Sequence, residues 1–225
     1  QANWAGTVYH GIPKNLYSLH DRPGKYLAFL GRISPEKCPD HAIEVAKRVG
    51  MPLRIAAKVD PADHEYFKQK IERLLDHPLI EYVGEINDAE KNDFLGEAAA
   101  LVCPYDWPEP FGLVLIEAMA CGTPVLAYRR GSIPEIIDHG VTGYVCDNIG
   151  EMAQAVAGLP LIDRNRCREI FEKRFTVERM AKDYLVLYER MATASHRPRL
   201  VPQARAAGHA RTSVVQCVAP QTDVA

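Results

Sequence analysis

The sequence lacks the features that mark several large classes of protein. Its 225 residues carry a formal net charge of −2, so it shows none of the positive excess typical of nucleic-acid-binding domains. It has no apolar run of about 18 residues, the length of a membrane-spanning helix. Its first residues have neither the charged nor the apolar region of a signal peptide. We therefore predict a cytoplasmic protein with no nucleic-acid partner and no transmembrane segment, and peripheral contact with the inner face of a membrane stays possible.

Several ligand-binding motifs are also missing. The sequence contains no G-x-G-x-x-G, no G-x-x-x-x-G-K-[ST], no H-E-x-x-H and no D-x-D. These absences argue against dinucleotide oxidoreductases, P-loop nucleotidases, metal hydrolases and the large class of sugar transferases that hold a metal through D-x-D. We expect neither a metal nor a cofactor.

The six cysteines are not spaced as metal ligands. None forms a C-x-x-C pair, and several lie in apolar runs, such as Leu101-Val102-Cys103. This pattern favours small buried thiols in a reducing compartment over a disulfide or zinc framework.

Short apolar runs alternate with amphipathic stretches along most of the chain. Continuous apolar runs are typical of strands covered by helices on both faces, and short strand–helix connections indicate a parallel sheet. The sequence predicts an α/β fold, a doubly wound parallel-sheet Rossmann-like domain followed by C-terminal helices. The predicted strands are 26–30, 53–57, 79–83, 100–103, 124–128 and 143–146; the predicted helices are 40–49, 60–75, 88–98, 113–120, 134–138, 149–159, 163–174 and 177–191.

The end of the chain differs in composition from the rest. Residues 193–225 are rich in Ala, Pro, Arg and Gln and show neither helical nor strand periodicity. We interpret this stretch as a disordered, mildly basic tail. A nucleic-acid role for it is the weaker alternative.

One loop combines a helix start with two carboxylates. The strand that ends at Cys103 is followed by a loop to Gly112, and a helix begins at Leu113. The first turn of a helix offers free backbone N–H groups and the positive end of the dipole, which together suit a diphosphate. Glu117 lies one turn into this helix, where it can accept hydrogen bonds from a ribose, and Glu109 precedes the helix.

Two cations are predicted at the same edge of the sheet. Arg32 and Lys37 follow the first strand, and the carboxyl ends of parallel strands meet at one edge. Arg presents a planar fork to phosphate oxygens and Lys a point charge. Together they could stabilise a leaving diphosphate without a metal. Glu36 and Lys58 are weaker candidates, and Trp107 either packs the loop or covers the sugar.

These residues resemble a known family. Glu109-x7-Glu117 within Glu-Pro-Phe-Gly-Leu-Val-Leu-Ile-Glu-Ala-Met-Ala-Cys-Gly-Thr-Pro-Val is similar to the donor-site motif of the retaining, GT-B-fold glycosyltransferases of family 4. Phe29-Leu30-Gly31-Arg32 through Lys37 resembles the family's phosphate-binding loop, and 131–137 and 140–143 resemble the segments that follow. The resemblance covers residues 24–148 and, more weakly, the helices to Met191.

The resemblance implies a role for each matching residue. A nucleoside diphosphate sugar (UDP-, GDP- or ADP-sugar) is the expected donor substrate. The diphosphate would contact Arg32 and Lys37, the ribose Glu117, and the donor sugar Glu109. The remaining contacts implied are the backbone at Gly31, Phe111, Gly112, Leu113 and Val114, and Val83 beside the base.

The resemblance also divides the chain into parts. Residues 1–23 resemble the crossing segment from an N-terminal acceptor domain that this sequence lacks, 24–160 the nucleotide-sugar-binding domain, and 161–192 the C-terminal helices. The acceptor, whether a glycan, a lipid or a small molecule, would bind through the missing domain. The alternatives are a non-catalytic nucleotide-sugar-binding remnant and, against the Glu-x7-Glu spacing, a GT-B-type sugar-nucleotide epimerase.

Overall fold

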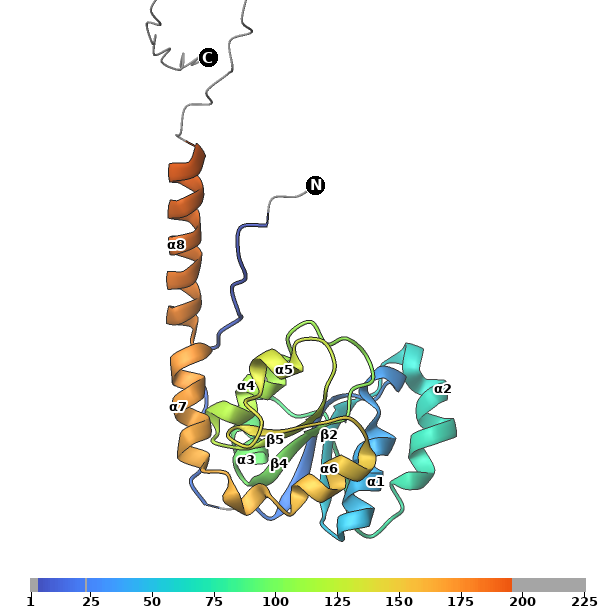
Figure 1. Ribbon diagram of the computed structural model, residues 1–225. Coiled ribbons are helices and arrows are strands. Elements are labelled where there is room, and N and C mark those ends of the chain that lie inside the picture. Colours follow the sequence, from blue (N-terminus) through green and yellow to red (C-terminus); the bar gives the residue numbers. More distant parts are fainter. Residues whose placement is uncertain (1–3, 23, 196–225) are drawn as a thin grey trace, which may run out of the picture.

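A parallel sheet of six strands forms the centre of the computed structural model, which describes residues 4–22 and 24–195 (Figure 1). The spatial order is β3-β2-β1-β4-β5-β6. The order reverses between β1 and β4, so their carboxyl ends flank the switch point where doubly wound sheets bind ligands. The predicted α/β Rossmann-like fold is confirmed. The strands are β1 (Tyr26–Arg32), β2 (Leu53–Lys58), β3 (Ile80–Gly84), β4 (Ala98–Cys103), β5 (Val125–Tyr128) and β6 (Gly143–Cys146).

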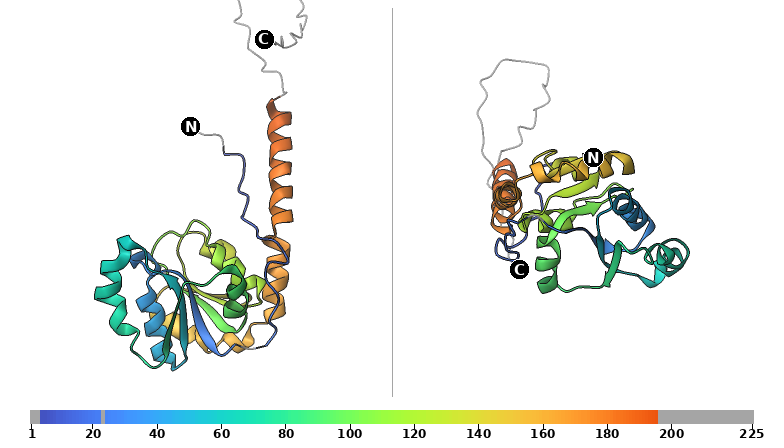
Figure 2. Two further views of the ribbon diagram at one scale, coloured as in Figure 1. Left: turned by 180° about the vertical axis from the view of Figure 1, so that it is seen from behind. Right: turned by 90° about the horizontal axis from the view of Figure 1, so that it is seen from below.

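Helices cover both faces of the sheet (Figure 2). On one face α1 (Pro39–Val49) packs against α6 (Ile149–Val156), and on the other α4 (Leu113–Ala120) packs against α3 (Asp88–Gly96) and α7 (Arg164–Arg174). The short α5 (Ile133–Ile136) lies between β5 and β6. This coverage explains the continuous apolar runs of the central strands, whose faces both lie under helices. The edge strand β3 is largely exposed.

The stretch 60–75, predicted as one regular α-helix, is helical but irregular. The segment contains 3-10 turns at Pro61–Asp63 and Glu72–Leu74, one α-helical turn, α2 (His64–Tyr66), and a π-helical stretch at Phe67–Ile71. Ile71 is buried in the core, and its stretch contacts α1. The change in winding thus accompanies packing against α1, which apolar spacing along the chain does not encode.

Two predicted boundaries also need correction. The helix predicted over 88–98 ends at Gly96, and Ala98 already belongs to β4. The predicted tail begins too early, because the last helix, α8 (Val177–Ser195), includes its first three residues. The rest of the predicted tail, 196–225, lies outside the described residues.

Helix α8 extends away from the sheet, and the N-terminal segment runs out on the same side (Figure 1). The two are joined at their base, where Ile12 N–H donates to the Phe175 carbonyl at 3.0 Å and Val177 N–H to the Ile12 carbonyl at 3.1 Å. Tyr184 and Leu185 on α8 are exposed. No helix in the described part of the chain is long and apolar enough to cross a membrane.

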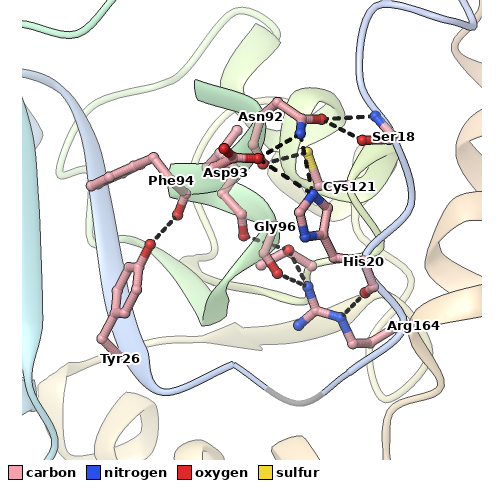
Figure 3. Close-up of polar contacts among 11 residues, drawn as sticks. Ser18, His20, Tyr26, Asn92, Asp93, Phe94, Gly96, Cys121 and Arg164 are labelled. Atoms are coloured by element: carbon pink, nitrogen blue, oxygen red, sulfur yellow. Dashed lines mark hydrogen bonds and ion pairs between the residues drawn. The ribbon is translucent and has the colours of Figure 1, made fainter. Parts of the chain in front are cut away.

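Arg164 ties the N-terminal segment to the sheet (Figure 3). Its buried guanidinium donates to the carbonyls of His20, Gly96 and Ala98 and to Thr123 Oγ1, over 2.5–2.9 Å. These acceptors come from four separate segments. Burying this charge is tolerated because Nε and both terminal nitrogens of the guanidinium donate hydrogen bonds to these acceptors.

The five cysteines that the structure describes are free and buried, which confirms the prediction for these residues. Burial raises the pKa of Cys103, Cys121 and Cys167 to about 12 and that of Cys146 to about 11. These thiols therefore keep their protons in the folded state at pH values where an unfolded thiol loses them.

This difference predicts that stability falls in alkali. Above about pH 8.5 the unfolded state binds fewer protons than the folded state, so the free energy of unfolding decreases as pH rises. Each such thiol contributes a loss of up to about 1.4 kcal/mol per pH unit until the pH reaches its folded pKa. Urea unfolding between about pH 8 and pH 10 measures the slope. Cys121→Ala should reduce it by one thiol's contribution, and an unchanged slope would show that Cys121 titrates normally.

Candidate donor-binding site

The amino end of α4 is shaped for a ligand. Gly112 precedes the helix with φ 80°, a left-handed conformation, and no side chain caps the first turn. The left-handed backbone favours glycine here, and a Cβ would also crowd Leu115 Cδ1 at 2.9 Å. The backbone N–H groups at Leu113 and Val114 are left for a ligand at the positive end of the helix.

The loop before α4 is held by the turn after β5. Ser132 N–H donates to the Glu109 carbonyl at 2.9 Å, and Ser132 Oγ donates to the Phe111 carbonyl at 3.2 Å. Gly131, with φ 53°, lies directly against the Glu109 backbone. The segment around Gly131, noted in the sequence only as a matching motif, therefore fixes the position of Glu109.

Phe111 anchors the same loop from the other side. Its buried ring packs edge-on to His10, with centroids 5.0 Å apart, and to Phe175 at 6.1 Å. The ring thus faces the N-terminal segment and the end of α7. The backbone contact with the donor that the resemblance implies for Phe111 stays a prediction.

Lys37 and Glu109 form a buried ion pair. Lys37 Nζ lies 2.6 Å from Glu109 Oε2, with side-chain exposures of 15% and 9%. The ammonium also lies 3.9 Å from the centroid of the Tyr105 ring. Loss of one partner from such a pair typically costs about 3–5 kcal/mol, because the other charge stays buried. The two residues therefore act as one unit.

Glu117 has a cationic neighbour that sequence reasoning missed. Lys91 Nζ lies 3.5 Å from Glu117 Oε1 and 2.9 Å from Asp88 Oδ1. Burial opposes the charge on Lys91, but the hydrogen bond to Asp88 and the charges of both carboxylates outweigh it and raise the Lys91 pKa. The Glu117 side chain is only 13% exposed, and the neighbouring Lys91 ammonium balances its charge.

Tyr17 is a further buried neighbour of Glu117. Its hydroxyl has no hydrogen-bond partner among the described residues. Burial raises the Tyr17 pKa, and the nearby Glu117 charge raises it further.

Arg32 is placed differently from Lys37. Its guanidinium contacts Glu36 Oε1 at 2.9 Å and Asp60 Oδ2 at 3.5 Å, and its side chain is 50% exposed. Exposed ion pairs of this kind are worth about 0–1 kcal/mol, so little holds Arg32 in this position.

A pocket of about 410 Å³ brings most of these residues together at the carboxyl ends of β1, β2 and β4. Of the predicted site residues, it is lined by Gly31, Lys37, Glu109, Gly112, Leu113, Val114 and Glu117. Arg32, Phe111 and Val83 are not among the lining residues, and Glu85 and Ile86, just after β3, take the place expected for Val83. Lys58, the weaker candidate, lines the pocket, as do Lys91 and Tyr105.

Lys91 and Tyr105 differ in whether the sequence could have revealed them. Asn87 and Glu90 form a capping box at the start of α3, a recognisable signal that places Lys91 in the first turns, after β3. Nothing in the sequence distinguishes Tyr105 from any aromatic residue after a strand.

A larger hollow, of about 490 Å³, lies at the opposite edge of the sheet between His20 and Glu97. Doubly wound sheets bind their ligands at the carboxyl ends of the strands, and this hollow adjoins the amino ends of β1 and β4. In the described residues, no group of three or more His, Cys, Asp or Glu side chains could hold a metal ion.

Residues 18–174 match the model of the family described as glycosyl transferases group 1. The chain belongs to this family. It is 30% identical to D-inositol 3-phosphate glycosyltransferase of Mycobacterium leprae over 201 residues, which cover 78% of this chain and 45% of that enzyme. The chain thus spans about half the length of this curated relative.

Solved structures show the same fold. Anabaena HepE in complex with UDP-glucose superposes with a TM-score of 0.69 at 20% identity, covering 84% of this chain and 57% of that one. The C-terminal domain of the group 1 family protein LpcC from Francisella tularensis has a TM-score of 0.61 at 22% identity, covering 74% of this chain and all of that domain. The second match is to a domain of this kind crystallised by itself.

Proposed function

We propose that this chain binds a nucleoside diphosphate sugar and supplies the donor site of a retaining family 4 glycosyltransferase. The main support is the meeting of the α4 amino end, the Lys37–Glu109 pair and Glu117 in one pocket at the switch point of the sheet. Membership of the glycosyl transferases group 1 family agrees with this function, as does a structural neighbour that holds UDP-glucose.

Each part of the donor has a matching group. The diphosphate lies at the first turn of α4, where N–H groups and the dipole stabilise its charge. Glu117 accepts hydrogen bonds from the ribose, and Glu109 from the donor sugar. Lys37 keeps its ion pair with Glu109 when the donor binds, because separating a buried pair is costly. The loosely held Arg32 swings from Glu36 to the phosphates, which stabilises the leaving diphosphate during transfer.

The acceptor is bound, in this proposal, by a domain outside this chain, and transfer retains the anomeric configuration without a metal. The protein is cytoplasmic, and a lipid acceptor would bring it into peripheral contact with the inner face of a membrane.

Calorimetric titration of the chain with UDP, GDP and ADP tests donor binding. We expect one-to-one binding of at least one of them, weakened about 3- to 10-fold in Arg32→Ala, which loses one exposed phosphate contact. Arg48→Ala is the matched control, since Arg48 pairs only with Glu44 in the same way, at 2.7 Å, on the outer surface of α1. If no nucleotide binds, or if the two variants behave alike, the proposed diphosphate site is wrong.

Incubation with the sugar nucleotide separates transfer from epimerisation. We expect NMR spectra of UDP-glucose to show no new nucleotide-linked sugar. Such a product would instead identify the chain as an epimerase.

A further inference from the structure

Among the described residues, the Trp107 side chain has one hydrogen-bond partner, the carboxylate of Glu109. The residue lies in the loop between β4 and α4, half-buried against the core. Its indole Nε1–H donates to Glu109 Oε2 at 3.0 Å. Trp107 is not among the residues that line the pocket, so the structure does not support stacking of its ring on a bound sugar.

The same carboxylate oxygen is held from a second direction. Lys37 Nζ donates to Glu109 Oε2 at 2.6 Å, and the ammonium lies 5.1 Å from the centroid of the Trp107 ring. Oε2 therefore accepts from two donors on different elements. Oε1 accepts a hydrogen bond from none of the described residues, although Glu109 lines the pocket.

Two donors on one oxygen fix the plane of a carboxylate. The terminal torsion of a Glu side chain is soft, and a lysine, which donates as a point charge, does not set it. The indole N–H is rigid and points in one direction. With both in place, the lone pairs of Oε1 keep a constant direction, ready to accept from a hydroxyl of a ligand in the pocket that Glu109 lines.

We propose that Trp107 is a positioning residue that orients Glu109 toward the sugar half of the donor. This rests on the proposed function, in which Glu109 contacts the sugar and not the nucleotide. The indole acts only through Glu109, so its removal should affect the sugar and leave the diphosphate and ribose contacts intact.

Trp107→Phe keeps an aromatic ring in the loop and removes the N–H. Calorimetry on the folded chain should compare UDP with UDP-glucose, GDP with GDP-mannose and ADP with ADP-glucose. For the pair that the wild type binds, we expect the variant to leave the Kd of the diphosphate within about twofold. We expect it to raise the Kd of the sugar nucleotide by about 5- to 10-fold, the effect of losing about one ordinary hydrogen bond, because the indole acts on the sugar only indirectly. Trp4→Phe, at the other tryptophan of the chain, is the control, since Trp4 is 83% exposed.

The outcomes are distinguishable. Equal weakening of both ligands would mean that Trp107 only supports the loop, and no weakening of either would mean that the hydrogen bond has no part in binding; both overturn the inference alone. If the wild type binds no nucleotide and no sugar nucleotide, the proposed function fails and this inference fails with it.

A second measurement does not depend on the folding of Trp107→Phe. In Trp4→Phe, Trp107 is the single tryptophan, so its indole N–H gives one NMR signal. We expect this signal to move more with the sugar nucleotide than with the diphosphate, and to move upfield in the additional variant Glu109→Gln. A signal that responds equally to both ligands, or not at all to Glu109→Gln, contradicts the role.

Discussion

Replacing Glu117 by Gln should lower the affinity of the chain for a nucleoside diphosphate by about 10- to 100-fold, the range for hydrogen bonds to a charged group. Gln keeps the size of the side chain and loses its charge. Lys91 stays paired with Asp88 at 2.9 Å, so the substitution does not leave an unpaired buried ammonium. The loss therefore reports the hydrogen bonds of the carboxylate to the ligand.

Glu44→Gln serves as the control for this experiment. It removes a carboxylate from the exposed face of α1, where Glu44 pairs with Arg48 at 2.7 Å. Calorimetry should show wild-type affinity for it. An affinity for Glu117→Gln within twofold of the control would mean that Glu117 does not touch the nucleotide.

Gly131→Ala should both destabilise the fold and abolish donor binding. A Cβ at this position would lie 2.5 Å from Glu109 N and closer still to the Glu109 carbonyl oxygen, so the loop must move. The left-handed backbone, with φ 53°, adds a cost of about 1–2 kcal/mol for any residue with a Cβ, and the collision adds about 1–3 kcal/mol. Because Lys37 and Trp107 both hold Glu109, displacement of its backbone disturbs the whole group.

Gly140→Ala isolates the contribution of the collision. Gly140 also has a left-handed backbone, with φ 78°, but a Cβ there meets no atom within 4 Å. Urea unfolding should show a loss of about 1–2 kcal/mol for this variant, and calorimetry should show normal binding of the sugar nucleotide. If the two variants lose equal stability and both bind the sugar nucleotide as the wild type does, the turn at Gly131 does not position Glu109.

The sheet was predictable from sequence because its signal is local. Runs such as Leu27-Ala28-Phe29 are apolar at every position, and the six predicted strands all occur, with ends displaced by only a few residues. The stretch from Pro61 to Leu74 was not predictable in detail, because 3-10, α and π turns differ only in which carbonyl each N–H reaches. The π-helical stretch ends at the buried Ile71, and burial is a property of the whole fold rather than of local spacing.

In the candidate site, too, some features were predictable from the sequence and others were not. The sequence alone predicted that Lys37, Glu109 and Glu117 lie at one edge, because parallel strands end on the same side. It did not reveal that Arg32 turns away to Asp60, which follows the neighbouring strand, or that Lys91 reaches Glu117 from α3. Those contacts depend on the lateral order of strands and helices. Local pattern does not encode that order.

The most direct test of the donor site is to follow the backbone amides during nucleotide titration. When the chain is labelled with nitrogen-15 and titrated with UDP, GDP or ADP, the largest changes in amide chemical shift should occur at Gly31, Gly112, Leu113 and Val114. Shifts centred instead on the hollow between His20 and Glu97, or saturating nucleotide that leaves the amides at the start of α4 unmoved, would contradict the account.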